Sequence, residues 1–277
     1  MVSDKIEKSY KVAKWIEKPD TLASVKRYEE TLSEMKRITE HEWIVNELKK
    51  KKNAQILDVC GGWGIAGVAL SKTLREKKID TKLTILDIRR DVKEDSRAFT
   101  KRELGEEAEL VVEDATRIGT INQFDFAIMW GYSTPHFNPW QMTKLIANIS
   151  RNLRENGFFL IEEMDRLFTV FVQSGYQRVL AERVTEDRAI LSLHSGYEPM
   201  KGSFSRLLVD LFEGKPTSEE FFFWGLASLA QMLWMFFEDV DFIQRDRYRG
   251  VLIAKKPRRD MALEAYASLE PRLLRQA

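Results

Sequence analysis

An aspartate followed by a cluster of glycines stands where a short apolar strand would give way to a helix. Asp58 lies near the end of the apolar run 55–59, and Gly61, Gly62 and Gly64 follow it. Glycines let the backbone turn tightly and approach a ligand closely. The first turn of the next helix would direct free N–H groups and a positive dipole end towards the same point. The stretch therefore predicts a nucleotide-type cofactor site at the carboxyl edge of an open α/β sheet.

Two further carboxylates follow the next two apolar runs, and together with Asp58 they indicate which cofactor binds. Asp87 ends the run 82–87 and can accept hydrogen bonds from both hydroxyls of a ribose. Asp114 follows the run 109–113 and can accept one from the amino group of an adenine. Asp58 would attract an ammonium group and repel a pyrophosphate. A ligand with an ammonium group, a ribose and an adenine, and without phosphate, is S-adenosylmethionine.

The same glycine run also matches the motif of a different cofactor. Residues 62–67, Gly-Trp-Gly-Ile-Ala-Gly, fit the G-x-G-x-x-G pattern of dinucleotide-binding proteins, and Asp87 lies 20 residues beyond Gly67. An NAD-dependent oxidoreductase is therefore an alternative, and a non-catalytic S-adenosylmethionine-binding protein is another. Because Asp58 would stand beside the pyrophosphate of a dinucleotide, S-adenosylmethionine is the preferred ligand.

With these residues, the chain resembles the class I S-adenosylmethionine-dependent methyltransferases of the small-molecule type. The resemblance covers about 55–162, and residues 241–255 are similar to the antiparallel last two strands of that fold. The usual family motif is acid-x-Gly-x-Gly-x-Gly. Here residues 58–64 read Asp-Val-Cys-Gly-Gly-Trp-Gly, so that Cys60 takes the first glycine position, similar to a variant of quinone-biosynthesis methyltransferases.

The resemblance also implies which residues would contact each part of the cofactor. Those around the methionine part and the sulfonium would be Asp58, Cys60, Gly62, Gly64, Trp130 and Gly131. Those around the adenosine part would be Asp87 at the ribose and Ile88, Asp114 and Ala115 at the adenine.

Strand–helix alternation is the frame that would position these residues. Apolar runs predict strands at 55–59, 82–87, 109–113, 124–130 and 158–162, with helices at about 65–78, 91–103 and 140–154. Short apolar strands joined by helices predict a parallel sheet with right-handed crossovers. Two later strands, 241–247 and 250–255, would complete an α/β, Rossmann-like, seven-stranded sheet that is mostly parallel with an antiparallel last strand.

Three segments fall outside this alternation. Residues 1–50 carry apolar residues at helical spacing and predict a helical N-terminal cap. Residues 165–218 show strand-like stretches between glycines and prolines, which predicts an inserted antiparallel lid over the site. The tail 258–277 is expected to be helical and peripheral. The cofactor-binding core would then comprise 51–164 and 219–257.

One apolar segment, residues 221–237, is predicted to form a helix capped by Ser218, Glu219 and Glu220. It is apolar on every face, slightly short for a membrane-spanning helix, and flanked by acidic residues in place of Lys or Arg. A helix that is apolar all round is usually buried. We therefore expect it in the core or at a homodimer contact, with a wall of an apolar substrate pocket as the alternative, and no stable membrane insertion.

The loop 130–140, after the fourth predicted strand, occupies the position where this family usually places substrate groups. Tyr132 and His136 are the candidates for contacting or deprotonating the acceptor, and His194 in the predicted lid is a further candidate. The loop lacks the Asn/Asp-Pro-Pro-aromatic signature of methyltransferases that act on adenine bases and glutamine amides, so no nucleic-acid partner is expected. It also lacks the acidic residue that magnesium-dependent catechol enzymes carry there, so no metal is expected. The predicted reaction is in-line methyl transfer to a small molecule.

Composition limits the remaining classes of function. Lys and Arg number 44 against 43 Asp and Glu, which gives no overall attraction to nucleic acid or an anionic membrane. One cysteine in 277 residues excludes an intramolecular disulfide and suits a reducing cytoplasm. The first residues contain no apolar signal core. We therefore expect a cytoplasmic location.

Overall fold

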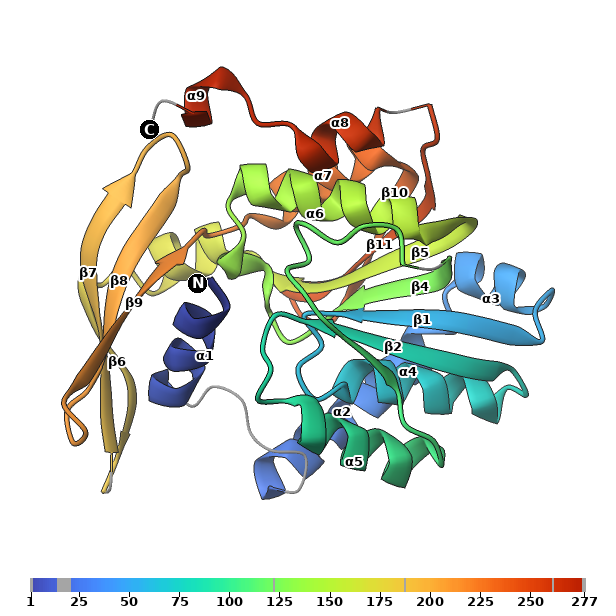
Figure 1. The fold of residues 1–277 in the computed structure, drawn as a ribbon, viewed down its shortest axis with the longest axis horizontal. Helices are drawn as coiled ribbons and strands as arrows, with labels where there is room; N and C mark the ends of the chain where they lie inside the picture. The colour runs from blue at the N-terminus through green and yellow to red at the C-terminus, as the bar shows by residue number, and fades with distance from the viewer. Residues whose placement is uncertain (1, 14–20, 122, 187, 261, 276–277) are drawn as a thin grey trace.

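Two β-sheets stand side by side in the protein, a large one and a smaller one (Figure 1). In this computed structural model, residues 2–13, 21–121, 123–186, 188–260 and 262–275 are described. The strands of the large sheet are β1 (Asn53–Val59), β2 (Asp80–Asp87), β3 (Glu109–Val112), β4 (Phe124–Met129), β5 (Leu153–Met164), β10 (Phe237–Gln244) and β11 (Arg249–Pro257). Their order across the sheet is β10-β11-β5-β4-β1-β2-β3.

The pairing within the large sheet confirms the predicted Rossmann-like fold. Strands β1 to β5 pair in parallel, whereas β11 is antiparallel to both of its neighbours, β5 and β10. Because parallel strands point the same way, β1, β2 and β4 all deliver their last residues to one edge of the sheet. The residues predicted to hold the cofactor follow these three strands and β3.

Helices cover both faces of the large sheet (Figure 1). On one face lie α2 (Leu22–Ile38), α3 (Glu42–Leu48), α4 (Ile65–Glu76) and α5 (Lys93–Leu104); on the other lie α6 (Pro139–Asn152), α7 (Leu226–Phe236) and α8 (Leu263–Ser268). Successive residues of β1 alternate between the two apolar layers: Ile56 packs in the layer with α2 to α4, and Leu57 in the layer with α6 and α7. Burial on both faces explains why the strands read as continuous apolar runs.

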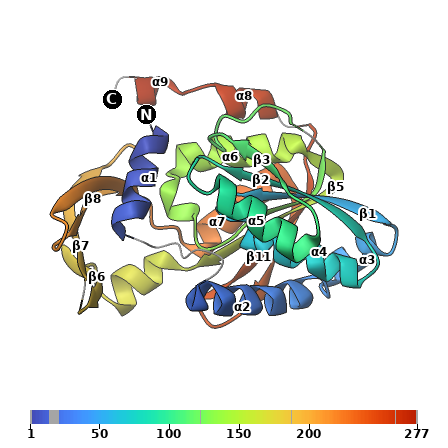
Figure 2. The same ribbon diagram turned by 60° about the horizontal axis from the view of Figure 1, so that its bottom comes forward.

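The small sheet is the predicted antiparallel insertion. It consists of β6 (Val179–Thr185), β7 (Arg188–Glu198), β8 (Ser203–Asp210) and β9 (Lys215–Phe221), and it follows the π-helix η2 (Leu167–Gln173). The N-terminal helix α1 (Val2–Ala13) lies between this sheet and the rest of the chain, as Figure 2 shows, and packs against β8 and β9. Val12 and Ala13 of α1 are buried together with Leu208 of β8. A short helix, α9 (Arg272–Arg275), lies in the tail.

The prediction of one helix over residues 221–237 was wrong. Phe221 ends strand β9, Gly225 is the N-cap of α7, and Phe237 already belongs to β10. The side chains before α7 alternate as in a strand: Phe221 and Phe223 line a cavity, whereas Phe222 and Trp224 pack against each other at 4.6 Å between ring centroids. An unbroken apolar run in a sequence does not distinguish a strand from a helix. The alternation of side chains in this segment becomes visible only in the structure, where every second side chain faces the cavity.

Two consequences follow for this segment. The residues Ser218, Glu219 and Glu220 pair with β8 and do not cap a helix. Helix α7 is also not buried all round, because Trp234 and Met235 are 58% and 47% exposed while Leu229 and Leu233 are fully buried. No helix within the described ranges has the length and apolar character needed to span a membrane.

Candidate functional site

A cavity of about 610 Å³ lies between the carboxyl edge of the large sheet and the small sheet. Every residue predicted for the site lines it except Gly64 and the further candidate His194; those that line it are Asp58, Cys60, Gly62, Asp87, Ile88, Asp114, Ala115, Trp130, Gly131, Tyr132 and His136. Tyr10 and Arg27 from the N-terminal helices also line it, as do residues of η2, β6, β8 and β9. The cavity therefore joins the predicted cofactor edge to the predicted lid.

The glycine loop after β1 depends on left-handed backbone conformations. Cys60, Gly62 and Gly64 have φ angles of 55°, 56° and 84°. A Cβ at Gly64, the N-cap of α4, would collide with the side chain of Ile85, so Gly64 shapes the loop from behind the cavity wall. Cys60 adopts a conformation that favours glycine, which accounts for the glycine usual at this position. Burial raises the pKa of the Cys60 thiol, so it is a poor nucleophile.

Asp58 is a buried carboxylate with only one of its two oxygens paired. Its Oδ2 accepts a hydrogen bond of 2.8 Å from the N–H of Gly67 in α4. Its Oδ1 is buried without a partner among the described residues. Burial raises the pKa of Asp58 to about 7. A cationic group in the cavity would supply the missing partner and favour the ionised form.

The two other predicted carboxylates hold loops as well as lining the cavity. Asp87 Oδ2 accepts a 2.8 Å hydrogen bond from the N–H of Gly62, and its Oδ1 accepts one of 2.9 Å from the N–H of Arg89. Asp114 Oδ1 accepts 2.8 Å hydrogen bonds from the N–H and the hydroxyl of Thr116. Each carboxylate oxygen can accept more than one hydrogen bond, so both groups can still receive a ligand hydroxyl or amine.

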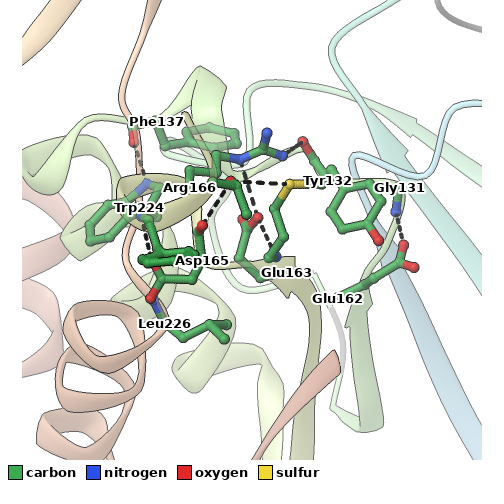
Figure 3. A network of polar contacts seen from close by, with 12 residues as sticks. Gly131, Tyr132, Phe137, Glu162, Glu163, Asp165, Arg166, Trp224 and Leu226 are labelled. Atoms are coloured by element: carbon green, nitrogen blue, oxygen red, sulfur yellow. Dashed lines mark hydrogen bonds and ion pairs between the residues drawn. The ribbon is translucent and has the colours of Figure 1, made fainter. Parts of the chain in front are cut away.

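The loop after β4 is held in place by the end of β5. Gly131 and Tyr132 have φ angles of 78° and 61°. Figure 3 shows the N–H of Gly131 donating to Glu162 Oε2, at 2.8 Å. Glu162 Oε1 accepts from Arg245 Nη1 at 2.7 Å. A Cβ at Gly131 would meet the guanidinium end of Arg27, which is flexible and could move aside, so the positive φ angle is the main reason for glycine here.

The two predicted catalytic candidates differ in their surroundings. His136 ends the short helix η1 (Thr134–His136), and its Nε2 lies 3.3 Å from the hydroxyl of Tyr10. Desolvation, together with the nearby Arg166 and Arg89, lowers the pKa of His136 to about 4, so the ring is neutral at neutral pH. Burial and Glu162 raise the pKa of Tyr132, so it is a protonated phenol there. His194 does not line the cavity; its Nδ1 lies 2.8 Å from the hydroxyl of Tyr176.

Several cavity residues have no counterpart in the sequence-based prediction. Arg89 is 3% exposed, its guanidinium lies 4.4 Å from the ring centroid of Tyr10, and its Nη2 has no partner among the described residues. Arg166 and Tyr176 line the part of the cavity next to the small sheet. Arg89 and Arg166 each stand two residues after the last residue of a strand, which is the signal that could have marked them. Arg27 lies within α2, and nothing in its local sequence places it at the site.

No cluster of three side chains of the kind that bind metals is found in the parts of the chain that the structure describes.

A family model described as a methyltransferase domain matches residues 56–157. No curated protein matches the sequence. The fold is similar to that of a Pyrococcus horikoshii OT3 protein, with 17% identity, a TM-score of 0.61 and coverage of 91% of this chain and 99% of that one.

Two further solved structures share the fold. One is an S-adenosylmethionine-dependent methyltransferase from Clostridium acetobutylicum, with 13% identity, a TM-score of 0.56 and coverage of 78% and 90%. The other is the 1,6-didemethyltoxoflavin-N1-methyltransferase of Burkholderia thailandensis with bound substrate and S-adenosylhomocysteine, with 16% identity, a TM-score of 0.50 and coverage of 93% and 88%.

Proposed function

We propose that this chain, whose residues 56–157 match the family model of a methyltransferase domain, is a class I S-adenosylmethionine-dependent methyltransferase that transfers a methyl group to a small molecule. The observation that carries the proposal is the convergence of the carboxylates Asp58, Asp87 and Asp114 on one cavity at the carboxyl edge of the sheet. Their order along that edge suits an ammonium, a ribose and an adenine.

The residues present fit the cofactor. The unpaired Oδ1 of the buried Asp58 suits the ammonium of the methionine part, and the Arg27 guanidinium against Gly131 suits its carboxylate. Asp87 would accept the ribose hydroxyls. Asp114, with Ala115 and Ile88, would surround the adenine. Trp130 would lie near the sulfonium, and Cys60, Gly62 and Gly64 would shape the loop around the methionine part.

The chemistry needs little beyond alignment and the exclusion of water. S-adenosylmethionine supplies a methyl group already activated on a sulfonium, and an in-line displacement moves it to the nucleophile. Tyr132 and His136 line the cavity and would orient the acceptor. A neutral His136 can accept a proton from a nucleophile, but its low pKa makes it a weak base, so it suits an acceptor that loses its proton easily.

The elements around the cavity favour a small acceptor. The α1 helix and strands β6, β8 and β9 border the cavity on the side away from the large sheet. These elements would act as a lid, and the cavity beneath them has room for a compact ligand. The Burkholderia thailandensis neighbour is a 1,6-didemethyltoxoflavin-N1-methyltransferase, and its small-molecule substrate supports a small-molecule acceptor here.

Titration calorimetry tests the choice of cofactor. We expect S-adenosylmethionine and S-adenosylhomocysteine to bind and NAD not to bind, because Asp58 would repel a pyrophosphate. Binding of NAD without either adenosyl compound would instead establish the oxidoreductase alternative. Transfer of a radiolabelled methyl group from S-adenosylmethionine is then assayed with metabolite, lipid and protein fractions as acceptors. If the adenosyl compounds bind but no fraction becomes labelled, the non-catalytic alternative applies.

A variant of Asp87 tests the position of the ribose. Asp87→Asn should weaken S-adenosylhomocysteine binding by about 10- to 100-fold, since it removes a charged acceptor of hydrogen bonds. Asp80→Asn is the matched control, because Asp80 lies at the opposite, exposed end of the same strand β2. Equal affinities for the two variants would refute the assignment of Asp87.

A further inference from the structure

Arg166 is a cationic side chain in the cavity wall that has unused hydrogen-bond donors. It follows β5, lines the cavity, and its side chain is 14% exposed. Its Nε lies 3.2 Å from Glu163 Oε1, and its Nη2 lies 3.4 Å from the backbone oxygen of Tyr132, as Figure 3 shows. No partner for Nη1 is found among the described residues. A guanidinium of this kind can still bind a planar anion.

The charge of Arg166 is offset only in part by its surroundings. Its counter-ion Glu163 is fully buried, with Oε2 unpaired in the described part of the chain, and burial raises the pKa of Glu163 to about 7. The buried Arg89, whose Nε lies 3.4 Å from Asp87 Oδ1, is a second cation, and both arginines lower the pKa of His136. The space in front of His136 is therefore electropositive, which disfavours an ammonium-bearing acceptor.

The carboxylates that line the cavity lie elsewhere. Asp58, Asp87, Glu113 and Asp114 are at the predicted cofactor end, and Glu182 is an exposed residue of β6. None of the five forms an ion pair with Arg166 in the described structure.

The cavity that Arg166 lines also has an aromatic wall. Phe221, Phe223 and Tyr176 line it. The Tyr176 ring stacks on Phe171 with centroids 5.4 Å apart and an interplanar angle of 12°. Its hydroxyl accepts a 3.0 Å hydrogen bond from Arg206 Nη1 and lies 2.8 Å from His194 Nδ1. Such a fixed aromatic surface favours a flat ligand.

We propose that the methyl acceptor is a planar aromatic carboxylate whose carboxylate binds to Arg166 while its ring packs against Tyr176, Phe221 and Phe223. This inference rests on the proposed methyl transfer, and it names the substrate class of the same site. Arg166 is then a specificity-determining residue, since it recognises a group of the acceptor that does not react.

The test uses the full chain saturated with S-adenosylhomocysteine. Hydroxybenzoates and aminobenzoates are titrated into it by calorimetry, each beside its neutral benzamide, with benzylamine as the cationic probe. At least one benzoate should bind about tenfold or more tightly than its benzamide, and benzylamine should bind no better than the benzamides. Arg166→Gln should abolish the preference, Arg166→Lys should keep part of it, and the exposed Arg178→Gln should leave it unchanged.

The inference is overturned if a benzamide or benzylamine binds as tightly as the benzoates, if the preference survives in Arg166→Gln, or if none of the benzoates binds. The affinity of the wild-type protein for S-adenosylhomocysteine is measured in parallel. If S-adenosylhomocysteine does not bind, the proposed function is in question. If S-adenosylhomocysteine binds but no benzoate does, only this inference is rejected. Because Arg166→Gln leaves Glu163 without its partner and can unfold the chain, the double variant Arg166→Gln/Glu163→Gln and Arg166→Lys provide the same comparison.

Discussion

At the scale of single residues, Asp58 is the group whose charge depends most on what occupies the cavity. It is 1% exposed, one oxygen is held by Gly67, and burial raises its pKa to about 7. Without cofactor and near neutral pH, Asp58 is therefore partly protonated and partly ionised. An ammonium beside Oδ1 would draw Asp58 towards the ionised form.

Affinity for S-adenosylmethionine should consequently rise with pH between about 5 and 7, by up to tenfold per pH unit, because binding requires Asp58 to lose its proton. Calorimetry in buffers with different ionisation enthalpies would detect the proton released. Asp58→Asn should bind more weakly and show no such slope. A wild-type affinity that stays constant over this range would contradict the pairing of Asp58 with the ammonium.

The stability of the cofactor-free protein should change in the opposite direction. The pKa of Asp58 is raised in the folded state, from 3.8 to about 7, so the folded chain keeps a proton that the unfolded chain has released. The stabilisation from this protonation is complete below the lower value and is lost as the pH rises through about 7. Glu163, also raised to about 7, contributes a slope of the same sign, so Asp58→Asn should reduce the dependence without abolishing it.

At the scale of elements, Glu162 connects the loop that follows β4 to strand β5 and to the turn after β10. It stands in β5, accepts from the N–H of Gly131, and pairs with Arg245 after β10. Arg245 also lies 3.5 Å from Glu34 of α2. The loop segment with positive φ angles at Gly131 and Tyr132 is thus held by Glu162 of β5, and Arg245 connects Glu162 to Glu34 of α2.

Glu162→Ala should lower the free energy of unfolding by about 2–3 kcal/mol, because it removes the acceptor of the Gly131 N–H and the nearer of the two carboxylates paired with Arg245. The exposed Glu238, which pairs with Lys256 at 3.4 Å, is the control, and Glu238→Ala should cost less than about 0.5 kcal/mol. Urea titrations of both variants measure the difference. Similar losses would show that Glu162 does not hold the loop.

At the scale of the whole molecule, α1 joins the small sheet to the cofactor edge. Ser9 hydrogen-bonds to Thr217 of β9 at 3.3 Å, and Tyr10, one residue later, contacts both His136 and Arg89. Among the described elements, α1 packs mainly on β8 and β9, so the large sheet does not depend on it for its core. This turn of α1 therefore links lid and site, in addition to the direct contact between Phe221 of β9 and His136, whose ring centroids lie 6.0 Å apart.

Deletion of residues 1–20 should leave the large sheet folded and slow methyl transfer by at least about tenfold, because it opens the cavity to water. Circular dichroism tests the first expectation and a radiolabelled methyl-transfer assay tests the second. Deletion of 271–277, which removes α9, is the control and should retain activity. Full activity without residues 1–20 would show that α1 does not close the site.

The sequence by itself determined the seven-stranded core and the strand-end carboxylates of the proposed cofactor site, since both depend on local patterns. Apolar runs, glycines and strand-end acids are close together in the chain, and parallel pairing brings the strand ends to one edge. The tertiary structure alone decided the acceptor end. Arg27 contacts Gly131, and Tyr10 contacts His136, although more than a hundred residues separate the members of each pair in the sequence. The periodicity of apolar residues within one helix or strand does not predict such long-range contacts. The run 221–237 divided into strand and helix for the same reason, since its alternation is visible only against the cavity and core on either side of it.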